Sequence, residues 1–427
     1  MSSCSISRPW SASAGWPQRR AGPASLSLWV LAAALFFVPS ALAVSRLSSR
    51  WPEQGGLYVW ARRSFGDWHG FLCGWCYWLS NVFYFPNLLL AGLGMAAYLF
   101  GERGVALSEN RTYLLTGALV LLWAGALTNL AGLRIGKWTE NLGGLATCAA
   151  GSLLLASGFA VWLRGKAAPI AGPWWPRWDW GTVNFWSQIA FAFGGLELAA
   201  AMAGEIRDPA RTVPRAAWLS GAAIAAFYLA GTVAMLILIP PGGASIITGL
   251  AQAGAAASQV LGAAWLGRLL AALVTLGVAG QLGAWLAGSA RIPFAIGLDR
   301  YLPPAFARLH PRWGTPHVAI LAQALACTVF LIAMQAGESP RAGYQSLVDM
   351  TVITYFIPFL YMFLAAARQG LRASAACGLA VTSLSIVVSL APPAEAERPL
   401  LFTAKIVGGC SLVLATARMV FARTRRA

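Results

Sequence analysis

Apolar residues fall into long blocks along the chain, and short polar or basic stretches separate these blocks. Most blocks have about 20 residues or more, the length that a helix needs to cross a hydrocarbon core of about 30 Å. Strands of a membrane barrel would alternate apolar and polar residues over about ten positions, and this chain has no such alternation. The pattern predicts an all-α, polytopic membrane protein. Its eleven predicted spans are residues 24–45, 70–99, 112–131, 140–163, 183–204, 216–240, 263–290, 317–336, 345–367, 374–391 and 400–420.

The composition agrees with this interpretation. Of the 427 residues, 58% are hydrophobic and 11% are charged, and the mean hydropathy is +0.64. About a quarter of the residues in an ordinary soluble protein are charged, so a water-soluble globule is excluded. No long polar insertion interrupts the blocks. We therefore expect a single membrane domain over residues 24–427, preceded by a polar, proline-rich segment at residues 1–23.

The 31 lysine and arginine residues are distributed unevenly between the two sides of the predicted spans. One set of alternate loops, together with the C-terminal tail, holds 19 of them, and the other set of loops holds seven. Because cytoplasmic loops are enriched in lysine and arginine, we predict that residues 46–68, 205–215 and 291–316 and the C-terminus face the cytoplasm, across a cell membrane. The net charge of +17 is spread over short loops, so the lipid bilayer is an expected partner and nucleic acid is not.

The N-terminal segment conflicts with this topology. Eleven spans with a cytoplasmic C-terminus place it outside, although it contains Arg8, Arg19 and Arg20. One interpretation is that the segment is exported despite its charge. A second is a signal peptide cleaved after Ala41-Leu42-Ala43, which would leave ten spans and place the basic loop 46–63 outside. A third is that a twelfth span is missing.

Metal, redox and enzyme chemistry are not expected from this sequence. There are three histidines, near loops, and seven cysteines, mostly inside the apolar blocks, where cysteine acts as a small hydrophobic residue. Cys73-Gly-Trp-Cys76 has redox spacing but lacks a second pair or a nearby histidine. No H-E-x-x-H motif, serine–histidine pair or pair of intramembrane aspartates is present. We predict no cofactor, no metal and no enzymatic activity.

The fifth predicted span contains an unusual glycine pair, Gly194-Gly195. Each glycine in a helix costs about 1 kcal/mol relative to alanine, so the pair favours an opening of the helix. Unwound backbone is tolerated in a membrane only where it lines a cavity or is buried in protein. The two half-helix ends would then offer N–H and C=O groups to a ligand. The alternative is that the glycines only allow close packing of helices.

Glu197 follows the glycine pair and is the only one of the 14 acidic residues near the middle of a predicted span. A charge in this position is costly unless it is paired, hydrated or protonated, so an intramembrane carboxylate indicates a functional site. The alternative is a neutral glutamate whose hydrogen bonds are satisfied by neighbouring backbone.

Four spaced motifs occur in the order found in a known family. They are Ser48-Ser-Arg-Trp-Pro-Glu-Gln-Gly-Gly-Leu-Tyr-Val-Trp-Ala-Arg-Arg-Ser-Phe-Gly66, the segment Phe191–Glu197, the loop Glu205–Arg215, and Ser289-Ala-Arg-Ile-Pro293 with Asp299-Arg-Tyr-Leu-Pro303. With these motifs, the chain from about residue 22 to its C-terminus resembles the amino acid–polyamine–organocation superfamily of permeases. The similarity is greatest to bacterial amino acid permeases and to their glutamate/γ-aminobutyrate antiporter-like branch.

The resemblance implies a LeuT-like fold, in which two inverted five-helix repeats are followed by two accessory helices. Substrate would bind at the midplane, between the discontinuous first and sixth helices of the family. Counted in this way, the first span of this chain matches family helix two, and the segment Phe191–Glu197 lies in family helix six. Family helix one has no counterpart in residues 1–20. The resemblance therefore predicts a shifted start site, a frameshift or a truncated copy.

The resemblance also implies roles for single residues. Phe191 matches an aromatic gate over the substrate. Ala192, Gly194 and Gly195 match the unwound segment that binds the substrate. Glu197 matches a glutamate that often follows this break, and it is a candidate for coupling to protons or substrate.

Two further residues match the substrate pocket of the family. Trp285 matches an aromatic residue that lines the pocket, although packing against lipid or core is an equal alternative in a chain with 20 tryptophans. Asn81 matches a pocket-facing polar residue, and its alternative role is a hydrogen bond between helices.

The sequence as a whole predicts a secondary active transporter for amino acids or related amines. Protons or a counter-substrate would drive it, by symport or by exchange. The alternative, which the missing helix favours, is a truncated or degenerate permease homologue that does not transport.

Overall fold

The computed structural model describes residues 22–101, 103–170, 172–239, 249–335, 340–391 and 399–424. Within these residues the chain folds into helices, and no strand occurs. The helices are α2 (Ala24–Ala32), a π-helical turn (Ala33–Phe37), α3 (Val38–Arg50), α4 (Leu57–Phe65), α5 (Asp67–Ala97), α6 (Arg103–Glu109), α7 (Arg111–Leu130), α8 (Leu133–Leu163), α9 (Trp180–Phe191), α10 (Leu198–Ala201), α11 (Pro209–Leu238), α12 (Gly249–Leu261), α13 (Trp265–Leu298), α14 (His317–Gln335), α15 (Pro340–Arg368), α16 (Arg372–Ser389) and α17 (Pro399–Thr424).

These helices reproduce the predicted spans in order. In the described part of the chain, nine helical stretches are long and apolar enough to cross a membrane. Two predicted spans remain. Span 317–336 corresponds to α14, whose apolar part is shorter, and span 183–204 corresponds to the interrupted pair α9–α10. Residues 1–21 lie outside the described ranges, so the boundary drawn at residue 23 stays a prediction.

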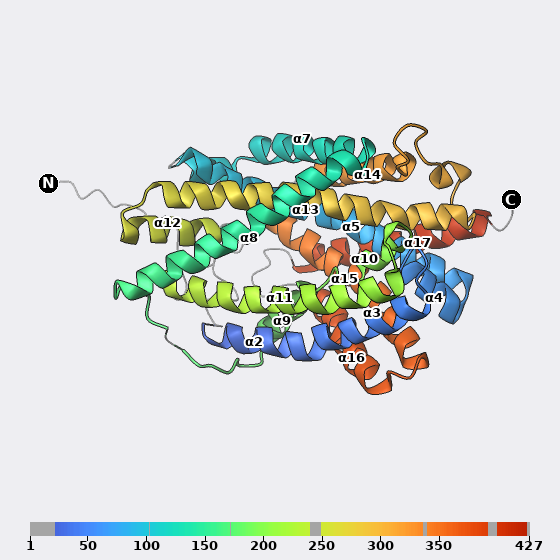
Figure 1. The fold of residues 1–427 in the computed structure, drawn as a ribbon, viewed down its shortest axis with the longest axis horizontal. Helices are drawn as coiled ribbons and strands as arrows, with labels where there is room; N and C mark the ends of the chain where they lie inside the picture. Colours follow the sequence, from blue (N-terminus) through green and yellow to red (C-terminus); the bar gives the residue numbers. More distant parts are fainter. Residues whose placement is uncertain are drawn as a thin grey trace.

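The helices α5 and α15 form the centre of the bundle. In the apolar stretch that would cross the membrane, 72% of the residues are buried in each of these two helices, compared with 17% in α11. Helices α5 and α15 therefore face protein on most sides. Figure 1 places α7, α13 and α14 along one side of this centre and α2, α3 and α16 along the other. A residue on α5 or α15 therefore reaches both halves of the bundle.

The first span contains one wide turn, which brings aromatic side chains to the centre. The turn Ala33–Phe37 is π-helical, and Pro39 follows it at the start of α3. Proline has no N–H and its ring crowds the preceding turn, which explains the wider hydrogen-bonding pattern here. From this turn, Phe36 packs against Phe356 of α15, with ring centroids 5.4 Å apart.

The segments that the charge distribution assigns to one side lie at one end of the bundle. Figure 1 shows α4 at the same end as the C-terminal end of α17. The ring of Phe421, in α17, packs against Trp68 at the start of α5, with centroids 5.1 Å apart. Asp299, just after α13, accepts a hydrogen bond from Tyr58 of α4. This grouping agrees with the predicted topology, whereas the side of the membrane that this end faces stays a prediction.

The structure differs from the expected boundaries at several places. Helices α8 and α11 begin at Leu133 and Pro209, before the predicted starts at residues 140 and 216. The amphipathic helix α4 lies within the predicted loop 46–68, and α12 lies between two predicted spans. In addition, α13 extends to Leu298, so Arg291 belongs to a helix and is 4% exposed. The expectation that Arg291 lies in a cytoplasmic loop was therefore wrong. Its ion pair with Glu205 (2.8 Å) supports a longer helix than hydropathy alone indicates.

Candidate functional site

The helix that begins at Trp180 is interrupted where the glycine pair predicts it. Helix α9 ends at Phe191, residues 192–197 form turns, and α10 begins at Leu198. Gly195 has a φ angle of +104°, which side-chain-bearing residues rarely adopt. A Cβ atom at this position would also lie 3.2 Å from the ring of Trp285. The backbone can therefore take this path only with glycine at position 195.

Glu197 lies at the end of this break and is almost completely buried, with 1% of its surface exposed. Its Oε1 atom accepts hydrogen bonds from the hydroxyl groups of Tyr355 (2.6 Å) and Tyr77 (2.9 Å). Its Oε2 atom accepts a hydrogen bond from the N–H of Gly195 (3.1 Å). These three donors are neutral, so they stabilise the carboxylate by hydrogen bonding without cancelling its charge.

The two tyrosines come from the central helices, Tyr77 from α5 and Tyr355 from α15. Gly194 makes room for one of them, since a Cβ atom there would lie 2.6 Å from the Tyr355 hydroxyl oxygen. The two glycines thus have different roles: Gly195 provides the backbone conformation, and Gly194 allows the close approach of Tyr355. The hydrogen bonds of Glu197 therefore connect the break to both central helices, α5 and α15.

Aromatic rings surround the break. Phe191 packs edge-on against Tyr355, with centroids 5.1 Å apart, and lies 6.3 Å from Tyr84. The ring of Trp285 lies 5.2 Å from that of Tyr84. The hydroxyl of Tyr84 also accepts a hydrogen bond from the side-chain amide of Gln281 (3.0 Å). This arrangement provides apolar surfaces for contact together with a few polar atoms for orientation, as ligand sites do.

Asn81 lies one helical turn after Tyr77 on α5 and is 1% exposed. Its amide group donates a hydrogen bond to the carbonyl of Tyr77 (2.7 Å). Its side-chain oxygen is buried and has no hydrogen-bond partner within the described ranges. A buried polar atom without a partner is costly, so this oxygen is available to accept a hydrogen bond from a ligand or a water molecule.

A polar cavity of about 550 Å³ lies beside Glu205, in the turn that follows α10. Its lining includes Glu205 and Arg291, whose carboxylate and guanidinium groups form two hydrogen bonds of 2.8 and 3.1 Å. Arg312 and Thr315, from the loop before α14, line the same cavity. Within the described ranges, no group of three or more histidine, cysteine or acidic residues could hold a metal ion.

The structure brings together most of the residues that the sequence predicts for the site. Phe191, Gly194, Gly195 and Trp285 are connected to Glu197 by the contacts described above. Ala192 lies on the same turn, and its carbonyl accepts a hydrogen bond from Tyr228 (3.3 Å). Asn81 joins the group only through the backbone of Tyr77. The assignment of these residues to substrate binding stays a proposal.

The sequence analysis missed three tyrosines of this site, Tyr77, Tyr84 and Tyr355. Tyr355 is 158 residues from Glu197 along the chain, and no local pattern connects the two. Tyr77 could have been found, because it precedes Asn81 by one helical turn and therefore shares its helix face.

The class of protein follows from this fold and from a comparison of the sequence with known families. The sequence model of the family described as amino acid permease matches residues 5–367. The match covers most of the 427 residues, and the chain therefore belongs to this family.

Individual proteins agree with this assignment. The chain is 29% identical over 345 residues to an uncharacterized transporter of Legionella pneumophila, a match that covers 80% of this chain and 73% of the relative. It is 28% identical over 341 residues to an uncharacterized transporter of Mycobacterium tuberculosis, covering 77% and 70%. The crystal structure of MhsT in complex with L-phenylalanine superposes with a TM-score of 0.58 at 14% identity, covering 94% of this chain and 95% of MhsT. The similarity to MhsT confirms the predicted all-α, LeuT-like fold.

Proposed function

We propose that this protein is a secondary active transporter that binds an amino acid or a related amine at the break between α9 and α10. The observation that carries the proposal is the buried carboxylate of Glu197 beside non-helical backbone. In the bundle of a permease-family protein, polar groups of this kind are tolerated where they contact a substrate or ion. The aromatic rings of Phe191 and Trp285 provide the apolar part of the site.

The charge of the site favours a zwitterionic or amine-bearing substrate over a dianion. Glu197 is acidic, and its hydrogen-bond partners Tyr77, Tyr355 and Gly195 are neutral. An ammonium group would therefore be attracted to the site, and a second negative charge would be repelled. The L-phenylalanine in the MhsT complex is consistent with this substrate class.

Proton coupling would act through the hydrogen bonds of Glu197. As a carboxylate, Glu197 accepts all three bonds, whereas a protonated acid carries one donor. A proton on Oε2 would point at the N–H of Gly195, and a proton on Oε1 would lie between two tyrosine hydroxyl groups. A tyrosine hydroxyl can turn and accept a hydrogen bond instead, whereas the N–H of Gly195 can only donate. A proton on Oε2 would therefore break the bond to Gly195 and loosen the contact between Glu197 and the break.

The substitution Glu197→Gln tests this function. The neutral amide resembles the protonated acid in size, so we expect pH-gradient-driven accumulation in proteoliposomes to disappear while substrate exchange or binding remains. Glu53→Gln is the matched control, because the Glu53 side chain is 47% exposed and pairs with Arg63 at the surface. Normal pH-driven uptake by Glu197→Gln would contradict the coupling role. Saturable uptake by the unmodified 427-residue chain would exclude the alternative of a non-transporting homologue.

We also propose that the end of the bundle containing α4 faces the cytoplasm, in agreement with its excess of lysine and arginine. A cysteine at position 210, in a cysteine-free background, should react with membrane-impermeant reagents only after cells are opened. Labelling from outside intact cells would contradict this orientation.

A further inference from the structure

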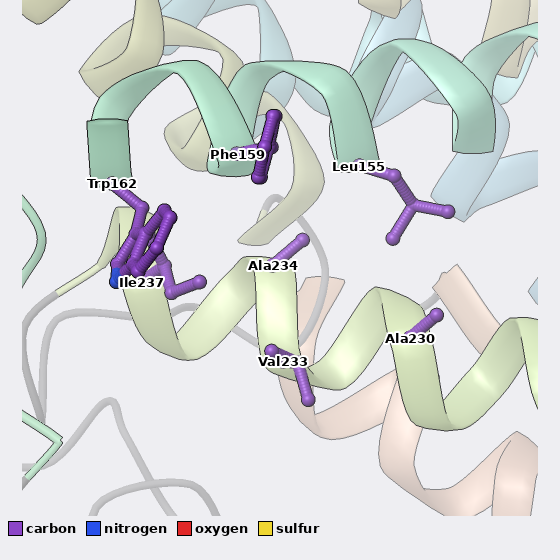
Figure 2. A pocket seen from close by; sticks show the side chains of 7 residues that line it. All are labelled: Leu155, Phe159, Trp162, Ala230, Val233, Ala234 and Ile237. Carbon is purple, nitrogen blue, oxygen red and sulfur yellow. The ribbon is translucent and has the colours of Figure 1, made fainter. Parts of the chain in front are cut away.

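An apolar groove of about 440 Å³ lies between α8 and α11, on helices that belong to the membrane-spanning part of the bundle. Figure 2 shows its side chains coming from these two helices. The lining residues are Leu155, Phe159, Trp162, Ala230, Val233, Ala234 and Ile237. Phe159 and Trp162 remain 59% and 55% exposed. Because the lining is apolar, the groove offers water no hydrogen bonds, and a hydrocarbon chain fits it better.

The segment that follows α8, at one end of this groove, is basic and forms what we call the rim. The chain leaves α8 just after Trp162, and the N–H of Ala168 then donates a hydrogen bond to the carbonyl of Ile237 (2.8 Å). The segment 163–168 is thus held beside the groove at both ends, by the chain connection to Trp162 and by the hydrogen bond to Ile237. Arg164 and Lys166 lie in this segment, and both are exposed. The Arg164 guanidinium also donates a hydrogen bond to the carbonyl of Val260 (3.1 Å), which fixes it near the end of α12.

The positive charge at the rim is not balanced by acidic residues nearby in the sequence. The segment 164–177 contains three of the seven basic residues in the less basic set of loops. No aspartate or glutamate occurs from residue 141 to 178, nor from residue 209 to 298. The same segment carries exposed tryptophans, including Trp174 and Trp175. Tryptophan is enriched at the membrane–water interface, so this segment suits the level of lipid headgroups.

We propose that the groove between α8 and α11 is a binding site for one anionic phospholipid. An acyl chain lies in the groove, and the phosphate of the headgroup lies against Arg164 and Lys166. A phospholipid fills the apolar groove with its acyl chain and compensates the charge of the basic rim with its phosphate. An apolar helix from a second copy of the protein would leave both cations uncompensated. The lipid would bridge α8 and α11, so its presence would stabilise their contact.

Native mass spectrometry of the purified, delipidated full chain tests this site. The chain is titrated with phosphatidylglycerol and with phosphatidylcholine that carries the same acyl chains. A basic residue near the surface contributes about a fivefold preference for anionic lipid, so with two such residues the first phosphatidylglycerol should bind about 25-fold more tightly. The double variant Arg164→Gln/Lys166→Gln should reduce its affinity to that of phosphatidylcholine. The control Arg111→Gln, an exposed arginine at the start of α7, should not.

A groove-filling variant tests the acyl-chain part of the site. Ala230→Phe should weaken the binding of both lipids, whereas Ala222→Phe, on an exposed part of α11 outside the groove, should leave it unchanged. Equal affinities of the unmodified chain for the two lipids would overturn the proposal. A lipid-free dimer that Ala230→Phe dissociates would also overturn it, in favour of a second copy as the occupant.

Discussion

Two clusters in the described part of the chain join a carboxylate to tyrosine hydroxyl groups, and they differ in what compensates the charge. Glu197 is buried at the break and accepts hydrogen bonds from Tyr77 and Tyr355. Asp299, at the end of α13, accepts a hydrogen bond from Tyr58 (2.5 Å) and forms an ion pair with Arg62 (2.5 Å). The first cluster is neutral apart from its carboxylate, whereas the second contains its own cation.

The surroundings of the Asp299 cluster keep Tyr58 and Arg62 protonated. Burial and the hydrogen bond to Asp299 raise the pKa of Tyr58 above its usual range, so the hydroxyl remains a donor at every physiological pH. The pKa of Arg62 is also raised, because hydrogen bonds to Asp67 and Asp299 outweigh its desolvation. The carboxylate of Asp299 pairs with a cation and connects α4 to the end of α13. The hydrogen-bond donors of Glu197, to which we assign the proposed coupling role, are all neutral.

Of the three substitutions that test this comparison, removal of a tyrosine hydroxyl from the Glu197 cluster should have the largest effect on transport. Tyr355→Phe deletes the 2.6 Å hydrogen bond to Glu197, and a hydrogen bond to a charged group contributes about 1.5–3 kcal/mol. We expect pH-driven uptake to fall about 10-fold to 100-fold, measured as initial rates in proteoliposomes at matched protein content. An uptake rate within twofold of the unmodified chain would show that the hydroxyl has no role in coupling.

The same substitution in the other cluster should affect stability and leave coupling intact. In Tyr58→Phe, Asp299 keeps its ion pair with Arg62, so the loss should be about 1 kcal/mol of the free energy of unfolding. Thermal unfolding in detergent measures this loss, and the pH profile of uptake should stay unchanged. A displaced pH profile would mean that the Asp299 cluster also titrates during transport.

The smallest effect is expected at an exposed pair. Arg63 and Glu53 lie 2.9 Å apart, the same distance as Tyr77 and Glu197, but their side chains are 56% and 47% exposed. Exposed ion pairs contribute about 0–1 kcal/mol, because water and salt screen them. Arg63→Gln should therefore leave both thermal stability and uptake within experimental error. A clear decrease in either would show that the pair supports α4 more strongly than its exposure indicates.

The spans and the break were predictable because they depend on local sequence. Hydropathy over about 20 residues locates a membrane helix, and Gly194-Gly195 locates the interruption. Helices α4 and α12 were missed, since each is short and neither crosses the membrane. Their formation depends on packing against the bundle, which hydropathy does not report.

The partners of the site residues were not predictable in the same way. Tyr355 and Glu197 meet only because α15 packs beside the break. The burial of Arg291 likewise depends on Glu205, which lies 86 positions away in the chain. In both cases the sequence indicates the residue types, and the tertiary structure decides which of them meet.

The π-helical turn Ala33–Phe37 has a consequence for the evolution and engineering of this chain. The turn holds one residue more than a regular α-helix would need, so deleting a residue there would convert it to α-helix. The wide turn takes up the extra residue, which in a regular α-helix would rotate the following half of the span by about 100°. The deletion would therefore keep the two halves of the span in nearly the same relative orientation. Phe36 packs on Phe356 and Phe37 stacks on Phe193 within the break. Both residues belong to the wide turn itself, so its conversion to α-helix would displace at least one of these rings. A homologous transporter with a regular first span should thus align to this chain with a single-residue gap inside a hydrophobic segment, where gaps are otherwise rare.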